Sequence, residues 1–148
     1  MRKADGRAVP IFIHQALTQQ PLTVHGDGSQ TRSLAYVDDT VEGFIRLLAA
    51  DGVTGPVNIG NPEEVTVRYL AEHIRDLAGA TSEIVYVGRP VDDPERRCPD
   101  ISLAREVLGW APAVTLDQGL ERTIKWCRRS GWAAGEPAPL AEPVGPVA

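Results

Sequence analysis

The chain has 148 residues, 43% of them hydrophobic, which suffices for one ordinary domain with a buried core. Its net charge of −5 at pH 7 leaves no basic excess to hold nucleic acid, and no apolar run of about 18 residues exists to cross a membrane. No signal peptide follows Met1, so we expect a cytoplasmic protein. Cys98 and Cys127 lie far apart and the histidines are dispersed, so we expect no metal site.

The first half of the chain predicts a helix, two strands and a second helix. Apolar residues recur at helical spacing over Arg7–Thr18. Two runs of strand-forming residues follow, Leu22–His25 and Thr31–Val37. Asp38 or Asp39 is expected to cap the second helix. The stripe that this helix should bury consists of Val41, Phe44, Ile45 and Leu48.

The second half predicts further short elements that begin at recognisable signals. We expect a short buried strand at Val57–Ile59, a helix after Thr66 and a strand at Glu83–Val87. Two further helices should follow, one after Asp100 and one from the capping box Thr115–Gln118. Gly109 should end the helix that Asp100 caps. These few short strands predict an α/β chain with a small mixed sheet and helices rather than a complete doubly wound sheet.

The end of the chain differs in composition from the rest. Trp132–Ala148 holds four prolines and two glycines and has no basic residue. Such a segment cannot bury enough apolar surface to order itself, so we expect a disordered tail. The ordered domain is then expected over residues 1–131.

The glycine-containing stretch Pro21–Asp39 is the best candidate for a binding site. Gly26 and Gly28 can adopt the positive φ that a tight turn often needs, and such a turn leaves backbone N–H groups exposed. Arg32 follows directly. Exposed amides with a guanidinium suit a diphosphate. On spacing alone, an ordinary hairpin with a surface arginine remains the alternative.

The stretch PLTVHGDGSQTRSLAYVDD resembles the nucleotide-sugar-binding segment of extended short-chain dehydrogenases/reductases, in the form found in UDP-glucuronate decarboxylases. The resemblance continues through Val57–Val67, Asp92–Ser102 and Leu108–Pro112 and covers roughly residues 1–129. It implies the C-terminal substrate-binding portion of an extended Rossmann-type reductase, with the N-terminal dinucleotide-binding domain missing. In that family the Val57–Ile59 strand completes the edge of the large sheet. Without that sheet, the edge of this strand and the apolar faces of the helices would lack the partners that they have in the family.

The resemblance also assigns substrate-binding roles to the glycine-containing stretch. It places Arg32 at the diphosphate of the nucleotide sugar, where a guanidinium can bind two phosphate oxygens. It places the strand through Leu22 and Val24 along the uracil, which the family reads partly through backbone groups. His25 stands where relatives often have tyrosine, and it can stack on the base or ribose.

Two further regions are implicated by the same resemblance. Arg97 matches an arginine that approaches the hexose carboxylate in the decarboxylases, with Arg96 beside it as a weaker candidate. Arg7 lies at the expected start of the first helix, where an anion is favoured, and would be near the sugar and diphosphate. Asn58, Asn61 and Glu64 are expected to be structural.

The implied parent activity is NAD-dependent decarboxylation of UDP-glucuronate to UDP-xylose. The chain contains neither the G-x-x-G-x-x-G fingerprint nor the Tyr-x-x-x-Lys pair on which the family's hydride chemistry depends, so we assign no catalytic or cofactor-binding residue. We therefore expect an inactive isolated chain that does not bind NAD alone, unless a separate chain supplies the other half. Two alternatives stay open: part of a nucleotide-sugar epimerase or 4,6-dehydratase, and a non-catalytic nucleotide-sugar-binding module.

Overall fold

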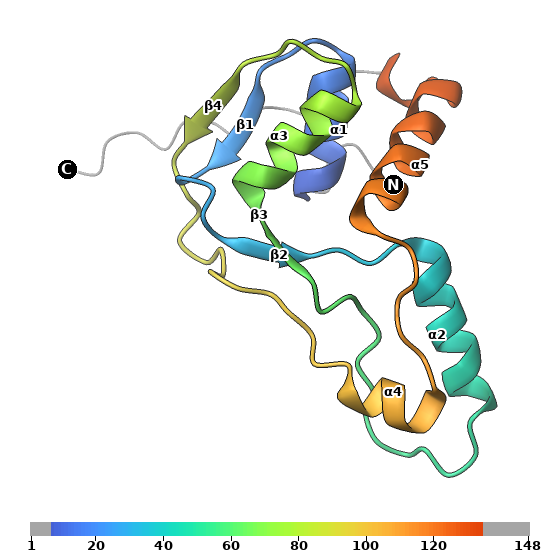
Figure 1. Cartoon of the computed structure of the whole chain (residues 1–148). Helices are drawn as coiled ribbons and strands as arrows, with labels where there is room; N and C mark the ends of the chain where they lie inside the picture. The colour runs from blue at the N-terminus through green and yellow to red at the C-terminus, as the bar shows by residue number, and fades with distance from the viewer. Residues whose placement is uncertain (1–6, 135–148) are drawn as a thin grey trace. The chain divides into compact units, whose positions relative to one another are not determined.

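The computed structural model of the chain describes residues 7–134 (Figure 1). Its elements are α1 (Ala8–Leu17), β1 (Leu22–His25), β2 (Thr31–Ser33), α2 (Val37–Ala49), β3 (Glu64–Thr66), α3 (Val67–Leu77), β4 (Ile84–Val87), α4 (Ser102–Leu108), α5 (Leu116–Arg129) and a 3₁₀ helix (Trp132–Ala134). The mixed α/β class is as expected, and the strands form two small sheets. No helix among the described residues is long and apolar enough to span a bilayer.

The chain divides into two compact units, which we describe separately. The first unit comprises Met1–Gln30, Thr66–Glu95 and Leu120–Ala148, so three separate segments of the sequence build it. The second unit comprises Thr31–Val65 and Arg96–Gly119. The candidate binding residues are therefore distributed over both units.

The first unit is built on a pair of parallel strands. β1 pairs with β4 in the register Leu22↔Ile84 to His25↔Val87. Helices α1 and α3 pack against each other and against β1 (Figure 1). Their apolar stripes, which the periodicity predicted, form the core together with α5. Its fully buried large side chains are Phe12, Ile13, Leu22, Val24, Leu70, Ile74 and Cys127.

The second unit has a small core around Trp110. Ile101 and Ala104 are buried with it, and Val57, Ile59 and Leu108 pack against this cluster. The Trp110 indole N–H donates to the carbonyl oxygen of Asp39 at 3.0 Å. That hydrogen bond joins the start of α2 to the chain that follows α4. The sheet of this unit is the short pair β2 and β3.

Three of the helix-terminal signals read from the sequence are confirmed, at Thr66, at the Thr115–Gln118 capping box and at Gly109. The Thr66 hydroxyl accepts from the Tyr69 amide at 3.1 Å. Thr115 and Gln118 form both hydrogen bonds of the capping box, each 3.3 Å long. Gly109 ends α4 with φ +57°, which a residue bearing Cβ adopts only with strain. The prediction that Asp100 caps α4 was wrong by one residue, because the N-cap is Ile101; the Asp100 carboxylate accepts from the Ser102 amide at 2.8 Å from the position before it.

The prediction for the start of α2 was wrong. The second strand ends at Ser33, the helix begins at Val37, and its N-cap is Tyr36 instead of Asp38 or Asp39. The Asp39 carboxylate is engaged elsewhere, because its Oδ2 accepts from the Val114 amide at 2.9 Å. The Asp39 side chain is therefore held by a hydrogen bond to a residue 75 positions further along the chain and not by the start of its own helix.

Two further expectations in the second unit were wrong. Residues 57–59 are not a strand and are not fully buried. A strand requires a backbone partner, and the structure provides none for this segment among residues 7–134. The α2 residues expected to be buried, Val41, Phe44, Ile45 and Leu48, are exposed.

The expected tail is described only at its start. Trp132–Ala134 form a 3₁₀ helix, so the change in composition at Trp132 does not end the regular structure. The remainder of the expected disordered segment, residues 135–148, lies outside the described residues.

Candidate functional site

The turn after β1 has the backbone that its glycines predict. Gly26 and Gly28 have φ of +65° and +74°. A Cβ on Gly28 would lie 2.8 Å from Val24 Cγ1 and 2.9 Å from Arg68 Cβ, so this glycine also permits a close approach. The turn does not make a hairpin: β1 and β2 belong to different sheets. Instead the Arg68 amide donates to the Gly28 carbonyl at 3.0 Å, which ties the turn to α3.

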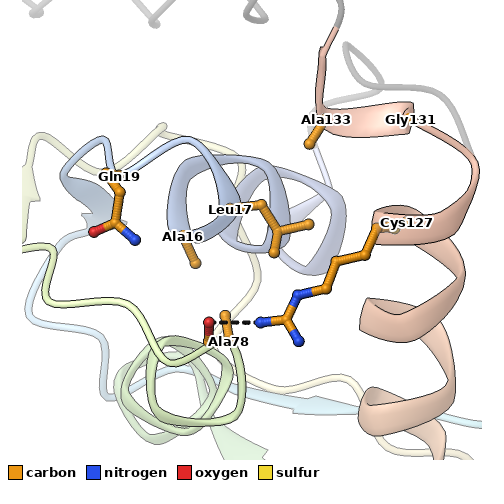
Figure 2. A pocket seen from close by; sticks show the side chains of 8 residues that line it. Ala16, Leu17, Gln19, Ala78, Cys127, Gly131 and Ala133 are labelled. Carbon is orange, nitrogen blue, oxygen red and sulfur yellow. Dashed lines mark hydrogen bonds between the residues drawn. The ribbon is translucent and has the colours of Figure 1, made fainter.

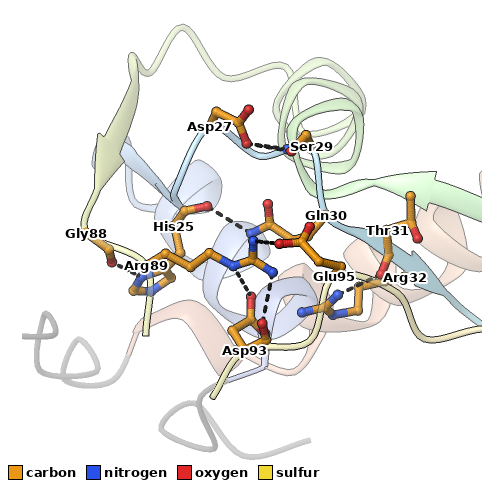
Figure 3. Close-up of polar contacts among 10 residues, drawn as sticks. All are labelled: His25, Asp27, Ser29, Gln30, Thr31, Arg32, Gly88, Arg89, Asp93 and Glu95. Atoms are coloured by element: carbon orange, nitrogen blue, oxygen red, sulfur yellow. Dashed lines mark hydrogen bonds and ion pairs between the residues drawn. The ribbon is translucent and has the colours of Figure 1, made fainter. Parts of the chain in front are cut away.

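Two of the turn amides expected to be exposed are used internally. The Gly26 N–H donates to the Val87 carbonyl at 2.9 Å. The Ser29 N–H donates to Asp27 Oδ1 at 2.9 Å, and the Ser29 hydroxyl donates to the same oxygen (Figure 3). These Ser29 hydrogen bonds lower the pKa of the Asp27 carboxyl, so the turn carries a stable negative charge. These two amides are therefore not available to bind an anion.

His25, at the end of β1, is held by hydrogen bonds on both its side chain and its backbone. Its Nδ1 lies 2.9 Å from the Gly88 carbonyl, and because a carbonyl only accepts, Nδ1 must carry the proton (Figure 3). The buried Gln30 amide group donates to the His25 carbonyl at 2.8 Å. The ring is half-buried, and its orientation is fixed beside the turn.

Leu22 and Val24 have fully buried side chains. Any ligand contact at these two positions would have to come from backbone atoms. Peptide groups alternate along a strand, so Thr23 and His25 direct theirs to the edge away from β4. On that edge the Thr23 amide is already bound by Gln15 Oε1 at 3.1 Å.

Arg89 is a cation that the sequence analysis missed. Its guanidinium pairs with Glu95 and Asp93, and Nη2 donates to the Asp93 carbonyl at 2.8 Å (Figure 3). Both carboxylates raise the pKa of Arg89, and Glu95 has the larger effect. The signal was available: Arg89 follows the expected strand Glu83–Val87 by two residues, and strand ends commonly carry functional side chains.

In the second unit, Arg32 lies in β2 and is half-buried. Its Nη1 donates to the carbonyl oxygen of Thr31 at 2.6 Å, so the side chain folds back along its own strand (Figure 3). One guanidinium nitrogen is thereby oriented by the backbone. The role of Arg32 at a diphosphate stays a prediction.

Arg96 is bound by an acid that we expected to be merely structural. Arg96 Nε lies 2.9 and 2.8 Å from the two carboxylate oxygens of Glu64, and Nη2 lies 2.5 Å from Oε2. The Thr31 hydroxyl also donates to Glu64 Oε1 at 2.5 Å. The hydrogen bonds from Arg96, which has the larger effect, and from Thr31 lower the pKa of Glu64 to about 2. Glu64 therefore joins β2, β3 and the loop that carries Arg96.

Arg97 differs from its neighbour. It is exposed and makes no hydrogen bond or ion pair within the described part of the chain. Arg96 is occupied by Glu64, whereas the guanidinium of Arg97 remains available to an anion. Arg7, in the first unit, is exposed at the N-cap of α1 and makes no capping hydrogen bond through its side chain.

The units thus divide the predicted site residues. The first unit holds Arg7, Leu22, Val24 and His25, and the second holds Arg32, Arg96 and Arg97. Within the first unit, the turn, His25 and Arg89 gather around the ends of β1 and β4. Within the second unit, Glu64 joins Arg96 to the first residue of β2.

A cavity of about 380 Å³ in the first unit contains none of these residues (Figure 2). It is lined by Ala16, Leu17, Gln19, Ala78, Cys127, Arg128, Gly131 and Ala133. Arg128 donates across it to the Ala78 carbonyl at 2.7 Å, at the C-terminal end of α3 (Figure 2). A cation at a helix C-terminus stabilises the helix, so the arginine here has a structural role.

The Glu64–Arg96 pair predicts a specific pH dependence. Because the pKa of Glu64 is lowered from 4.5 to about 2, the pair contributes stability above about pH 4.5 and loses it as the pH falls towards 2. Carboxyl carbon NMR should give a Glu64 midpoint near 2. Arg96→Gln should raise it towards 4.5, whereas the exposed Arg105→Gln should leave it unchanged. A wild-type midpoint near 4.5 would contradict the pairing.

Comparison with known proteins identifies relatives along most of the chain. The sequence profile of the GDP-mannose 4,6 dehydratase family matches residues 2–123. UDP-glucuronic acid decarboxylase 1 of Danio rerio is 46% identical over 129 residues, which are 87% of this chain and 31% of that protein. UDP-glucuronic acid decarboxylase 3 of Arabidopsis thaliana is 53% identical over 116 residues, 78% of this chain and 34% of that protein.

Solved structures of related enzymes have the same fold over this region. An epimerase of Methanothermobacter thermautotrophicus superposes with a TM-score of 0.81 at 33% identity, over 85% of this chain and 38% of the other. UDP-glucuronic acid 4-epimerase of Bacillus cereus, solved with UDP-glucuronic acid and NAD, superposes with a TM-score of 0.79 at 28% identity, over 84% of this chain and 40% of the other.

The chain spans about a third of the length of the curated relatives that it matches. The B. cereus enzyme holds NAD, whereas this sequence has no glycine fingerprint that opens a helix and no Tyr-x-x-x-Lys. It corresponds to one part of these enzymes. With its profile match, its relatives and its fold in agreement, the chain belongs to the GDP-mannose 4,6 dehydratase family of epimerase/dehydratase-type short-chain dehydrogenases/reductases.

Proposed function

We propose that this chain is the nucleotide-sugar-binding part of an NAD-dependent UDP-glucuronate decarboxylase, which converts UDP-glucuronate to UDP-xylose. The observation that carries the proposal is its identity of 45% to 53% with proteins named UDP-glucuronic acid decarboxylase. The solved epimerases cited above are 28% and 33% identical. The epimerase relationship keeps a nucleotide-sugar epimerase as the second candidate.

The arginines of the second unit support a doubly anionic ligand. Arg32 is half-buried and pre-oriented by its bond to the Thr31 carbonyl, which suits binding of a diphosphate. Arg97 is exposed with its guanidinium unengaged, which suits the C6 carboxylate of a glucuronate. Arg96 is held by Glu64, so we assign it the role of fixing the loop that carries Arg97.

The first unit supports the nucleoside end of the ligand. We propose that the β1 edge opposite β4 contacts the uracil through the Thr23 carbonyl and the His25 amide, because Gln15 occupies the Thr23 amide, Gln30 occupies the His25 carbonyl, and the Leu22 and Val24 side chains are buried. His25 lies half-buried at the end of this strand with its ring fixed by the Gly88 carbonyl, so it can stack on the base or ribose without further ordering. Arg7 at the start of α1 would add positive charge.

Binding and catalysis are separate tasks in this proposal. The hydride chemistry would require NAD and an acid/base tyrosine held beside a lysine, and neither motif is present in this sequence. We propose that this chain supplies substrate contacts and that a dinucleotide-binding part, in the same or a separate chain, supplies the redox cycle. The isolated chain is then expected to bind the nucleotide sugar without turning it over.

Arg97→Ala is the variant that separates the decarboxylase from its alternatives. Loss of one charge-assisted contact to a carboxylate should weaken UDP-glucuronate binding by about tenfold, while UDP-glucose binding should change less than about twofold. Isothermal titration calorimetry of the full chain measures both. Arg105→Ala, which removes an exposed arginine from α4 in the same unit, is the matched control.

The other outcomes distinguish the remaining candidates. An equal effect of Arg97→Ala on both sugars would remove the support for carboxylate recognition and favour the epimerase or dehydratase. Tight UDP-sugar binding, with no turnover even when an NAD-loaded dinucleotide-binding part is added, would favour a non-catalytic module. Failure of the wild-type chain to bind any UDP ligand would refute the proposed binding role.

A further inference from the structure

The residues that follow β4 lie against the turn that follows β1. The Gly26 amide donates to the Val87 carbonyl at 2.9 Å, one residue beyond the paired register of the two strands. The next carbonyl, that of Gly88, lies 2.9 Å from His25 Nδ1 (Figure 3). A Cβ on Gly26 would lie 3.3 Å from Arg89 Cδ, so the Arg89 side chain packs directly on the turn. Three consecutive residues therefore hold the two strand ends together.

The head group of Arg89 closes the loop on its other side. Its guanidinium forms ion pairs with Asp93 and Glu95, and Nη2 donates to the Asp93 carbonyl at 2.8 Å (Figure 3). The Arg89 side chain is only 25% exposed, so salt screens these contacts less than it screens a fully exposed pair. We call Arg89, Asp93 and Glu95 the Arg89 clamp. A planar guanidinium suits this arrangement because its donors are fixed in one fork.

Gly88 depends on this clamp because neither strand pairing nor a side chain orients its carbonyl. It lies one residue beyond the end of β4, and glycine has the widest choice of backbone angles. The Gly88 carbonyl and the Arg89 N–H belong to one planar peptide unit. Anchoring Arg89 therefore holds this peptide plane, and the carbonyl keeps its direction towards His25 Nδ1.

The Gly88 carbonyl in turn determines which nitrogen of a neutral His25 ring carries the proton. A carbonyl oxygen only accepts, so the proton lies on Nδ1 and Nε2 keeps its lone pair. Free neutral histidine in water favours the opposite tautomer, so the Nδ1–H form depends on the Gly88 contact. Within residues 7–134, His25 Nε2 makes no hydrogen bond and is not buried, so it is open to a ligand.

We propose that Arg89 is a positioning residue. Through Gly88 it holds His25 in the Nδ1–H tautomer, so that Nε2 accepts a hydrogen bond from a ribose hydroxyl of the bound nucleotide. The ligand half of this inference rests on the proposed function, in which the Thr23 carbonyl and the His25 amide contact the uracil. Uracil joined to ribose has a single N–H donor, which the Thr23 carbonyl accepts, so the ribose hydroxyls are the donors left for Nε2.

Nitrogen NMR of the histidine rings in the full chain tests the positioning role without a ligand. At about pH 8.5, where free imidazole is neutral, wild-type His25 should be protonated on Nδ1 and not on Nε2. Arg89→Ala should shift the ring towards the Nε2–H tautomer. Arg89→Lys keeps a charge for both acids and should restore part of the Nδ1–H form. Arg75→Ala, which removes the ion pair with Asp76 on α3 of the same unit, is the matched control and should change nothing.

Glu95→Gln provides a second route to the same result. The Glu95 side chain is 75% exposed, so this substitution weakens the Arg89 clamp without opening a cavity. It should shift the His25 tautomer in the same direction as Arg89→Ala, by a smaller amount, because Asp93 remains. Circular dichroism shows whether each variant is folded.

Calorimetric titration with UDP and its 2′-deoxy and 3′-deoxy analogues tests the contact with the ligand. Loss of one neutral hydrogen bond weakens affinity about fivefold, so the wild type should bind one of the two analogues that much more weakly than UDP. His25→Phe keeps an aromatic ring without an acceptor, so this difference should disappear. Gly88 is exposed, and water can replace the lost Nδ1–H at its carbonyl. In Arg89→Ala the difference should shrink, because part of the His25 population then carries its proton on Nε2.

The results that would overturn the inference are separate from a failure of the proposed function. A wild-type His25 protonated on Nε2, or an unchanged tautomer in Arg89→Ala and Glu95→Gln, would refute the positioning role. Equal affinity of the wild type for all three nucleotides, or a difference that persists in His25→Phe, would refute the hydroxyl contact. If UDP did not bind at all, the proposed function and the hydroxyl contact would fail together, whereas the tautomer would still decide the role of Arg89.

Discussion

Trp110→Ala is expected to destabilise the second unit by about 3–5 kcal/mol, which is the usual cost of truncating a buried aromatic side chain. Trp110 is 2% exposed and packs with Ile101 and Ala104 at the centre of the small core. The substitution opens a cavity that so few neighbours cannot fill. It also leaves the Asp39 carbonyl without the indole N–H at 3.0 Å. Urea denaturation followed by circular dichroism measures the change.

Two variants give this prediction its controls. Trp110→Phe retains most of the volume and removes only the N–H donor, so its cost should be smaller. Trp126→Ala removes a tryptophan that is half exposed on α5 and should change stability by less than about 1 kcal/mol. Hydrogen exchange should locate the loss at α2 and α4. A Trp110→Ala protein as stable as the wild type would mean that the cluster does not hold the second unit together.

Arg32→Ala is expected to weaken the binding of UDP, UDP-glucose and UDP-glucuronate alike, by about 10- to 100-fold. A charge-assisted guanidinium–phosphate contact contributes about 1.5–3 kcal/mol, and each 1.4 kcal/mol corresponds to about a tenfold change in affinity. The diphosphate is common to all three ligands, so the loss should not depend on the sugar. Calorimetric titration of the full chain measures it.

The pattern across variants identifies what Arg32 contacts. Arg32→Lys keeps the charge but not the planar fork, so it should recover only part of the affinity. Arg105→Ala should have no effect. If Arg32→Ala weakened only UDP-glucuronate, the arginine would contact the hexose carboxylate and the roles proposed for Arg32 and Arg97 would have to be exchanged. Unchanged affinity for UDP would remove Arg32 from the site.

Much of the local structure could be predicted because its signals are local. The Thr66 cap and the Thr115–Gln118 capping box each join residues three apart, so the sequence contains both partners. Gly26 and Gly28 have the positive φ that their turn predicts. The family resemblance was likewise readable, since its motifs occur as continuous runs in a fixed order.

Part of the candidate site could not be predicted in this way. Glu64 was expected to be a structural residue, but not its partner: it binds Arg96, which is 32 residues away, and its pKa of about 2 depends on that contact. The acidic partners of Arg89, Asp93 and Glu95, are only four and six residues away and could have been read from the sequence. Its approach to the turn at Gly26, in contrast, arises only when β1 and β4 pair, and no spacing rule connects those two segments.

The sequence by itself determined which segments are helical, where several of them begin and end, and to which family the chain belongs, because each depends on neighbouring residues or on continuous motifs. Only the tertiary structure decided which strands pair and which side of α2 is buried. An apolar stripe predicts that a helix has a partner but not where the partner lies. Here the contacts of Asp39 and Gly43 with Trp110, Val114 and Ile59 direct the stripe away from the core of its own unit.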